Sequence, residues 1–111
     1  MIVFSLSVVV PRSRRRDVVH SVGALLGHTR ATPGCMDCRL YADYEDSNAI
    51  MLIEEWASQA ALDRHLASDA YRTLVSAIEI STKPPRIHFD DVVQRGGLEV
   101  IAMARQQHPE T

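Results

Sequence analysis

The sequence has no long apolar run and only two cysteines. No segment approaches the roughly 20 consecutive apolar residues that a membrane-spanning helix needs, so we expect one soluble domain. The opening stretch MIVFSLSVVV lacks the basic start and the small-residue cleavage site of a secretory signal, which favours a cytoplasmic protein. Two cysteines in 111 residues are far below the density of a disulfide-stapled secreted domain, which agrees with a reducing compartment.

Excess charge of either sign is also missing. Twelve basic and 14 acidic residues give a net charge of -2, which argues against binding to nucleic acid, because phosphate recognition requires a basic face. One dense basic cluster is present, formed by Arg12, Arg14, Arg15 and Arg16. No aromatic residue interleaves this cluster, so we interpret it as the solvated start of a helix.

The spacing of the apolar residues predicts four strands and two helical stretches in a chain long enough for one compact core. Alternating apolar residues indicate the strands, and recurrence every three or four residues indicates the helices. Ser13 and Ser58 are suited to cap the helices. The expected strands are residues 2–10, 38–44, 50–56 and 86–93, and the expected helical stretches run from Ser13 to Gly27 and from Ser58, with a restart at Ser68, to the Pro84-Pro85 pair.

This β-α-β-β-α-β order is typical of an α+β, ferredoxin-like domain, in which an antiparallel sheet carries its helices on one face. We expect residues 1–95 to form the domain and residues 96–111 to form a C-terminal tail with the spacing of a short helix. The third strand places Trp56 on one face but Met51 and Ile53 on the other. Because two helices cover only one face, we predict a homodimer joined through the open sheet faces.

The two cysteines have the spacing C-x-x-C, at Cys35 and Cys38. This spacing is typical of a redox or metal site where both sulfurs lie on one side of a turn or a helix start. Here the segment enters a strand, in which residues three apart lie about 10 Å apart and point to opposite faces. None of the five histidines forms a second pair with ligand spacing. We therefore predict two free thiols and no metal site.

Residues 33–41 and the segment IEEWASQAALDRHLASDAY, from Ile53 to Tyr71, resemble the antibiotic biosynthesis monooxygenase family. The most specific part is the Glu55-Trp56 pair, followed by a helix and the His65-Leu66 pair. The resemblance extends over residues 2–93. It implies a dimeric α+β barrel, a pocket between the helices and the sheet of each subunit, and an oxygenase that acts on quinols or anthrones without a cofactor.

Three residues of this segment are the candidate site. His65 lies on the same helical face as Ala61 and Leu62, so we expect it to point inward, where partial burial keeps the imidazole neutral and able to accept a proton. It is the candidate catalytic base; the alternative is a core histidine bonded to a backbone carbonyl. Trp56 and Tyr71 are the candidate substrate-binding residues, as a flat wall for an aromatic ring and as a hydrogen-bond donor, although either could serve only to pack the core.

Two further features bear on this site. Glu54 and Glu55 are adjacent in a strand and so face opposite sides, which places one carboxylate toward a covered face. That carboxylate needs a partner. The ordinary interpretation is a salt bridge to an arginine, and the alternative is a carboxyl group whose raised pKa keeps it protonated. Many proteins of the resembled family carry a second histidine where this sequence has Ala70, which weakens a two-histidine mechanism.

We therefore predict a cofactor-independent monooxygenase of a small aromatic quinol or anthrone-like substrate, in which His65 helps to form the substrate anion and molecular oxygen attacks it. No glycine-rich phosphate loop or cluster of ligands for a cofactor appears in the sequence. Two alternatives stay open. One is a non-catalytic dimeric module that binds a small hydrophobic ligand, and the other is an isomerase or decarboxylase that uses the same pocket.

Overall fold

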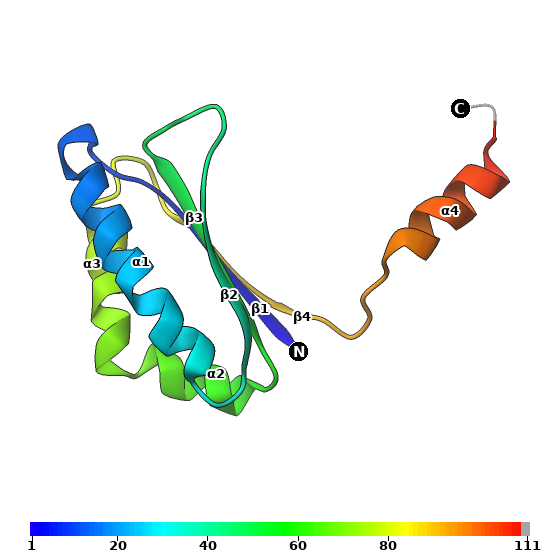
Figure 1. The fold of residues 1–111 in the computed structure, drawn as a ribbon, viewed down its shortest axis with the longest axis horizontal. Helices are drawn as coiled ribbons and strands as arrows, with labels where there is room; N and C mark the ends of the chain where they lie inside the picture. Colours follow the sequence, from blue (N-terminus) through cyan, green and yellow to red (C-terminus); the bar gives the residue numbers. More distant parts are fainter. Residues whose placement is uncertain (110–111) are drawn as a thin grey trace.

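The computed structural model describes residues 1–109, and in it three helices cover one face of a four-stranded antiparallel sheet (Figure 1). The strands are β1 (Ile2–Val9), β2 (Cys35–Ala42), β3 (Ala49–Trp56) and β4 (Arg86–Asp91), in the spatial order β2-β3-β1-β4. The covering helices are α1 (Arg15–Ala31), α2 (Gln59–Leu66) and α3 (Arg72–Glu79). The predicted α+β, ferredoxin-like arrangement is confirmed.

The buried layer between sheet and helices is built on the two central strands, β1 and β3. Every second residue of each strand is buried. Phe4 pairs with Glu54 and Ile2 pairs with Trp56, and directly paired residues of antiparallel strands point to the same face. Glu54 and Trp56 therefore point toward the helices. The apolar core beside them contains Phe4, Leu6, Val8, Val10, Val18, Val22, Ile50, Leu52 and Leu74, and each such buried side chain contributes about 1.5–3 kcal/mol.

The first helix starts and ends later than the sequence predicts. Ser13 lies in a 3₁₀ turn, Arg12–Arg14, and α1 begins at Arg15 with no side-chain cap, so the expected cap by Ser13 is wrong. The helix continues beyond Gly27 to Ala31, because its last turns still pack against β2 and bury Thr29. The Thr32-Pro33-Gly34 turn then ends it.

Gly34 holds the start of β2 against the start of α2. Its φ of 92° lies in the left-handed region that favours glycine, and an added Cβ would lie 2.4 Å from Cβ of Ala61. The Gly34 carbonyl also accepts a hydrogen bond from the backbone N–H of Ala57. This turn fixes the end of β3 and the first turn of α2, and these two elements supply the buried polar residues described below.

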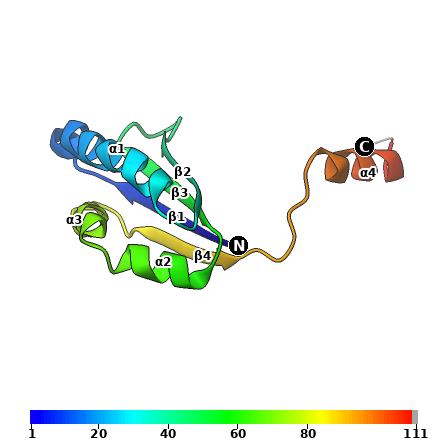
Figure 2. The same cartoon turned by 60° about the horizontal axis from the view of Figure 1, so that its bottom comes forward.

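The second helical stretch follows the sequence prediction closely. The side chain of Ser58 accepts a hydrogen bond from the backbone N–H of Ala61, which confirms the predicted cap of α2. The chain then restarts after Ser68 in a 3₁₀ turn, Asp69–Tyr71, which leads directly into α3. Figure 2 shows α1 on the β2 side of the sheet and α2 and α3 toward β4.

The opposite face of the sheet is open, and the chain after β4 leads away from it to α4 (Leu98–Gln107), as Figure 1 shows. The short helix that the sequence predicts in this tail is confirmed. Arg95, which precedes α4, pairs with Glu55 on the open face. The apolar side chains of α4, among them Leu98 and Ile101, are exposed. Within residues 1–109, none of the helices is long and apolar enough to cross a membrane.

Candidate functional site

Glu54 is a charged side chain sealed inside the helix-covered layer, with only 1% of its surface exposed. Oε1 accepts a hydrogen bond from Nε1–H of Trp56 at 2.9 Å, and the Cys38 thiol donates to Oε2 across 3.9 Å. A carboxylate accepts only, so burial requires donors of this kind. The arginine partner that the sequence suggested is wrong for Glu54. An arginine, Arg95, instead pairs with Glu55 on the open face.

His65 lies beside Glu54 and points inward from α2, as the sequence predicts. Nε2 of His65 is 3.4 Å from Oε1 of Glu54, and the side chains are 4% and 1% exposed. The distance is that of an ion pair, but the direction does not make a hydrogen bond, and Nε2 has no hydrogen-bond partner among the described residues. A small rotation of the imidazole would align Nε2 with the carboxylate. Nε2 bonds to no backbone carbonyl in the described part of the chain, so the alternative drawn from the sequence does not apply to this nitrogen.

Aromatic rings enclose the imidazole on two sides. The Trp56 and His65 rings stack with centroids 4.8 Å apart, and Tyr71 meets the imidazole edge-on at 5.7 Å. The three candidate residues are therefore brought together, with Glu54 joining two of them. Trp56 is fully buried, so its role as a wall for a substrate ring stays a prediction.

The space next to the imidazole is small. A void of about 10 Å³ is lined by Glu54, His65 and Ala70, together with apolar residues of α1 and α3. This volume corresponds to about one water molecule. Neither Trp56 nor Tyr71 lines it. The pocket implied by the family resemblance is thus closed at the imidazole in this conformation.

Burial raises the pKa of three side chains near Glu54, so these groups keep their protons at neutral pH. Desolvation, followed by the nearby charge of Glu54, raises the pKa of Cys38 to about 12. The same two causes raise the pKa of the Tyr71 phenol, so this group remains a donor at neutral pH. Desolvation is also the first cause that raises the pKa of Cys35. The thiols are therefore poor nucleophiles here.

Both cysteines point into the helix-covered layer, and the prediction that they face opposite sides is wrong. Cys35 pairs with Trp56 and Cys38 pairs with Glu54, with a register shift between Cys35 and Asp37. The shift is a bulge that takes up one extra residue, so positions three apart come to share a face. Both thiols are free, as predicted. Across residues 1–109, no three His, Cys, Asp or Glu side chains gather so as to hold a metal ion.

The sequence profile of the antibiotic biosynthesis monooxygenase family matches residues 1–77, well over half of the chain and the part that contains the Glu54–His65 pair. The chain belongs to this family. No curated protein matches its sequence at a significant level.

Solved structures agree with the family on the fold. The chain is 24% identical to an antibiotic biosynthesis monooxygenase, with a TM-score of 0.75 over 85% of this chain and 100% of the other. A protein of Mycobacterium tuberculosis is 22% identical, with a TM-score of 0.77 over 86% of this chain and 98% of its own. A protein of Deinococcus radiodurans is 14% identical, with a TM-score of 0.79 over 88% of this chain and 98% of its own. At these identities the comparison shows the fold alone.

Within this monooxygenase-family fold, the sequence pattern alone did not identify Trp56 and His65 as the neighbours of the Glu54 carboxylate. The signal was present: Glu54 has the same parity along β3 as Leu52 and Trp56, so the strand period of two places all three on one face. The proximity of His65 to that carboxylate could not be read in the same way, because it depends on how α2 docks against β3.

Proposed function

We propose that the protein is a cofactor-independent monooxygenase that oxidises a small aromatic quinol or anthrone-like substrate with molecular oxygen. The observation that carries the proposal is the buried Glu54–His65 pair with its unpartnered Nε2. Membership of a monooxygenase family supports the reaction class. The substrate class comes from the chemistry that one base in a dry site can perform.

His65 acts first, as the general base. It takes a proton from the phenol of a quinol, or from the methylene carbon of an anthrone, and leaves an electron-rich anion. The imidazole becomes a cation, and the Glu54 carboxylate 3.4 Å from Nε2 stabilises that charge where water cannot. A well-placed base of this kind contributes about 100- to 10,000-fold to a rate.

Oxygen then reacts with the anion without a separate reductant, because the substrate supplies the electrons. For an anthrone, the anion passes one electron to molecular oxygen, and the resulting radicals combine to form a carbon–oxygen bond. The peroxide takes up the proton held by His65, and the neutral imidazole then removes the second methylene proton as the oxygen–oxygen bond breaks. One oxygen atom remains as the new carbonyl, and the other leaves as hydroxide, which takes the second proton from His65 to form water.

The rings around His65 complete the proposal. The raised pKa of Tyr71 keeps its phenol protonated, so it can donate a hydrogen bond to a substrate oxygen. Trp56 stacks on the imidazole and fixes its plane while holding Glu54 through the indole N–H. Trp56 and Tyr71 thus serve substrate binding and orientation.

We also propose a homodimer formed through the open sheet face, in a cytoplasmic protein. Met51 and Ile53 are apolar residues of β3 that alternate with the buried set and so point to that face. Leu98, Ile101 and the other exposed apolar residues of α4 add surface that a partner subunit would cover. An isolated helix of this length is marginal in water, which supports a packing role for the tail.

An oxygen electrode tests the function directly, with a panel of hydroquinones and anthrones and with His65→Ala as the comparison. We expect the wild type to take up one oxygen molecule per anthrone. His65→Ala should lower the rate of this uptake about 100-fold or more. Circular dichroism confirms that the variant is folded. Absence of uptake with every compound, together with tight binding of one of them, would instead identify a non-catalytic binding module. Uptake that His65→Ala leaves unchanged would rule out the base.

A further inference from the structure

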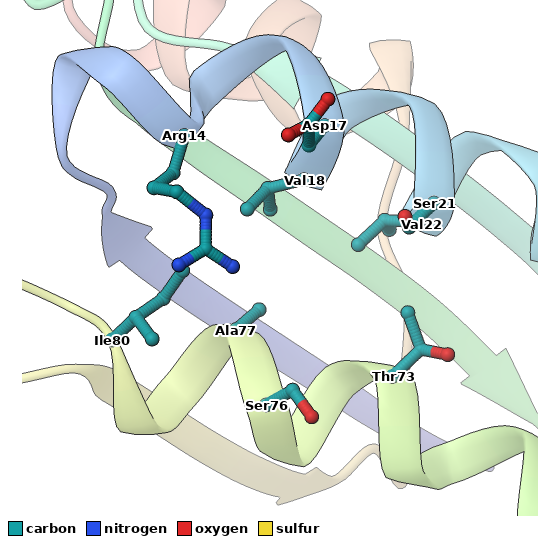
Figure 3. A pocket seen from close by; sticks show the side chains of 9 residues that line it. All are labelled: Arg14, Asp17, Val18, Ser21, Val22, Thr73, Ser76, Ala77 and Ile80. Carbon is teal, nitrogen blue, oxygen red and sulfur yellow. The ribbon is translucent and has the colours of Figure 1, made fainter.

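A groove lies between α1 and α3 on the helix-covered side of the molecule. Its volume is about 280 Å³, near the lower end of the range for small-molecule sites, which begins at about 300 Å³. Figure 3 shows Val18 and Val22 of α1 facing Ala77 of α3 across it, with Arg14 reaching in from the start of the helix. An apolar floor with a few polar side chains at the rim is the usual composition of a small-molecule site.

Shared walls connect this groove with the Glu54–His65 pair. Val22 lines the groove and also lines two small voids beneath it, each of about 10 Å³. Ala77 separates the groove from one void, and Leu74 lines both voids. The second void ends at His65, whose Nε2 is buried and unpartnered. Movement of the Val22 and Leu74 side chains would join these spaces into one cavity.

The rim carries polar groups without partners. The Arg14 guanidinium makes no hydrogen bond or ion pair among the described residues, and neither does the hydroxyl of Thr73. Arg14 lies in the arginine cluster that begins at Arg12, so the local potential there is positive despite Asp17. Arg15, by contrast, is already engaged with the carbonyl of Ser47.

We propose that this groove binds the substrate, and that the substrate is an aromatic phenol bearing a carboxylate. Arg14 pairs with the carboxylate at the rim, while the ring lies between Val18, Val22 and Ala77 and extends toward His65. An arginine matches a carboxylate geometrically through parallel N–H bonds. The inference rests on the proposed function for the nature of the ring, but the binding site is tested without turnover.

The binding test uses a hydroxynaphthoate with its hydroxyl and its carboxylate at opposite ends of the two rings, and the matching naphthol, which lacks the carboxylate. Isothermal titration calorimetry measures both. The wild type should bind the acid about tenfold more tightly than the naphthol, and Arg14→Gln should remove that preference. Arg12→Gln is the matched control, because Arg12 is an exposed neighbour in the same turn that does not line the groove.

A second pair of variants tests the groove itself. Ser21 is an exposed residue of α1 that lines it, so Ser21→Phe should weaken binding of both compounds about tenfold or more by filling the space. Ala24→Phe, on the same helix but outside the lining, should not. Equal affinity for acid and naphthol, a preference that survives Arg14→Gln, or normal binding by Ser21→Phe would each overturn the proposal.

Oxygen uptake separates this inference from the proposed function. If the acid binds as described and its dihydroxy analogue supports no oxygen uptake, the groove stands and the monooxygenase assignment fails. If uptake depends on His65 and is the same in Ser21→Phe as in the wild type, the assignment stands and the groove proposal fails.

Discussion

Oε1 of Glu54 lies 3.4 Å from Nε2 of His65, and both side chains are almost completely buried. The carboxylate reaches this position from the central strand β3, while the imidazole comes from α2, so the pair ties a helix to the sheet. Trp56 completes the arrangement by donating to the same oxygen that faces the imidazole. Two polar side chains this deeply buried lose their hydration and are costly to bring together, which is the reason to look for a chemical role.

Glu54→Gln should reduce kcat for oxygen uptake about 10- to 100-fold, because an amide cannot neutralise the imidazolium that forms when His65 takes a proton. The amide oxygen can still accept the indole N–H, so the fold should survive. Steady-state kinetics of the folded variant measure the effect, and KM should change less than kcat. Glu55→Gln, on the open face, is the matched control. Equal kcat in Glu54→Gln and wild type would show that the carboxylate takes no part.

The Cys38 thiol should make stability fall in alkaline solution. Its pKa is raised from 9.0 to about 12, so as pH rises above 9 the unfolded chain releases this proton while the folded protein still holds it. Stability from this source is complete below pH 9 and is lost as pH rises toward 12. The loss approaches about 1.4 kcal/mol per pH unit within that window.

Urea unfolding at several pH values checks this expectation. Cys38→Ala should show a shallower decline of the unfolding free energy than the wild type at about pH 9 to about pH 11. Cys35→Ala is the control, and its effect on the slope should be smaller because Cys35 is only partly buried. Identical slopes in all three proteins would contradict the assigned environment of Cys38.

The open sheet face provides a test of assembly. Ile53 lies on that face, paired with Ser5 and Arg39, so Ile53→Lys would place a charge in the proposed interface. We expect the dimer dissociation constant to rise about 30-fold or more in sedimentation experiments. Tyr44→Lys, at the fully exposed hairpin tip, should leave it unchanged. A wild-type protein that is monomeric at micromolar concentration would contradict the proposal of a dimer.

Much of the fold could be predicted because the strands follow simple periods. The alternation along β1 identifies its buried face, and Ser58 marks the start of α2 with the cap that the structure contains. The end of α1 could not be placed, since Gly27 is compatible with a helix that continues to pack on β2. Tertiary contact there outweighs the local preference of glycine for a helix end.

The site was only partly predictable. His65 could be placed inward from the helical period, and the resemblance drew attention to it. The bulge at Met36 has no sequence signal, and it alone reverses the expected orientation of one cysteine relative to the other. The pairing of His65 with Glu54 and the small volume beside them depend on side chains from α1, α3 and β3, which local patterns do not place.

Proton abstraction by His65 can be measured without oxygen. Under nitrogen and in heavy water, nuclear magnetic resonance follows the exchange of the methylene protons of anthrone, which isolates the first step from all later ones. We predict that the wild type accelerates this exchange and that His65→Ala lowers the acceleration about 100-fold or more, with Glu54→Gln between the two. Exchange at the same rate with the wild type and with His65→Ala would contradict the catalytic role of the buried pair.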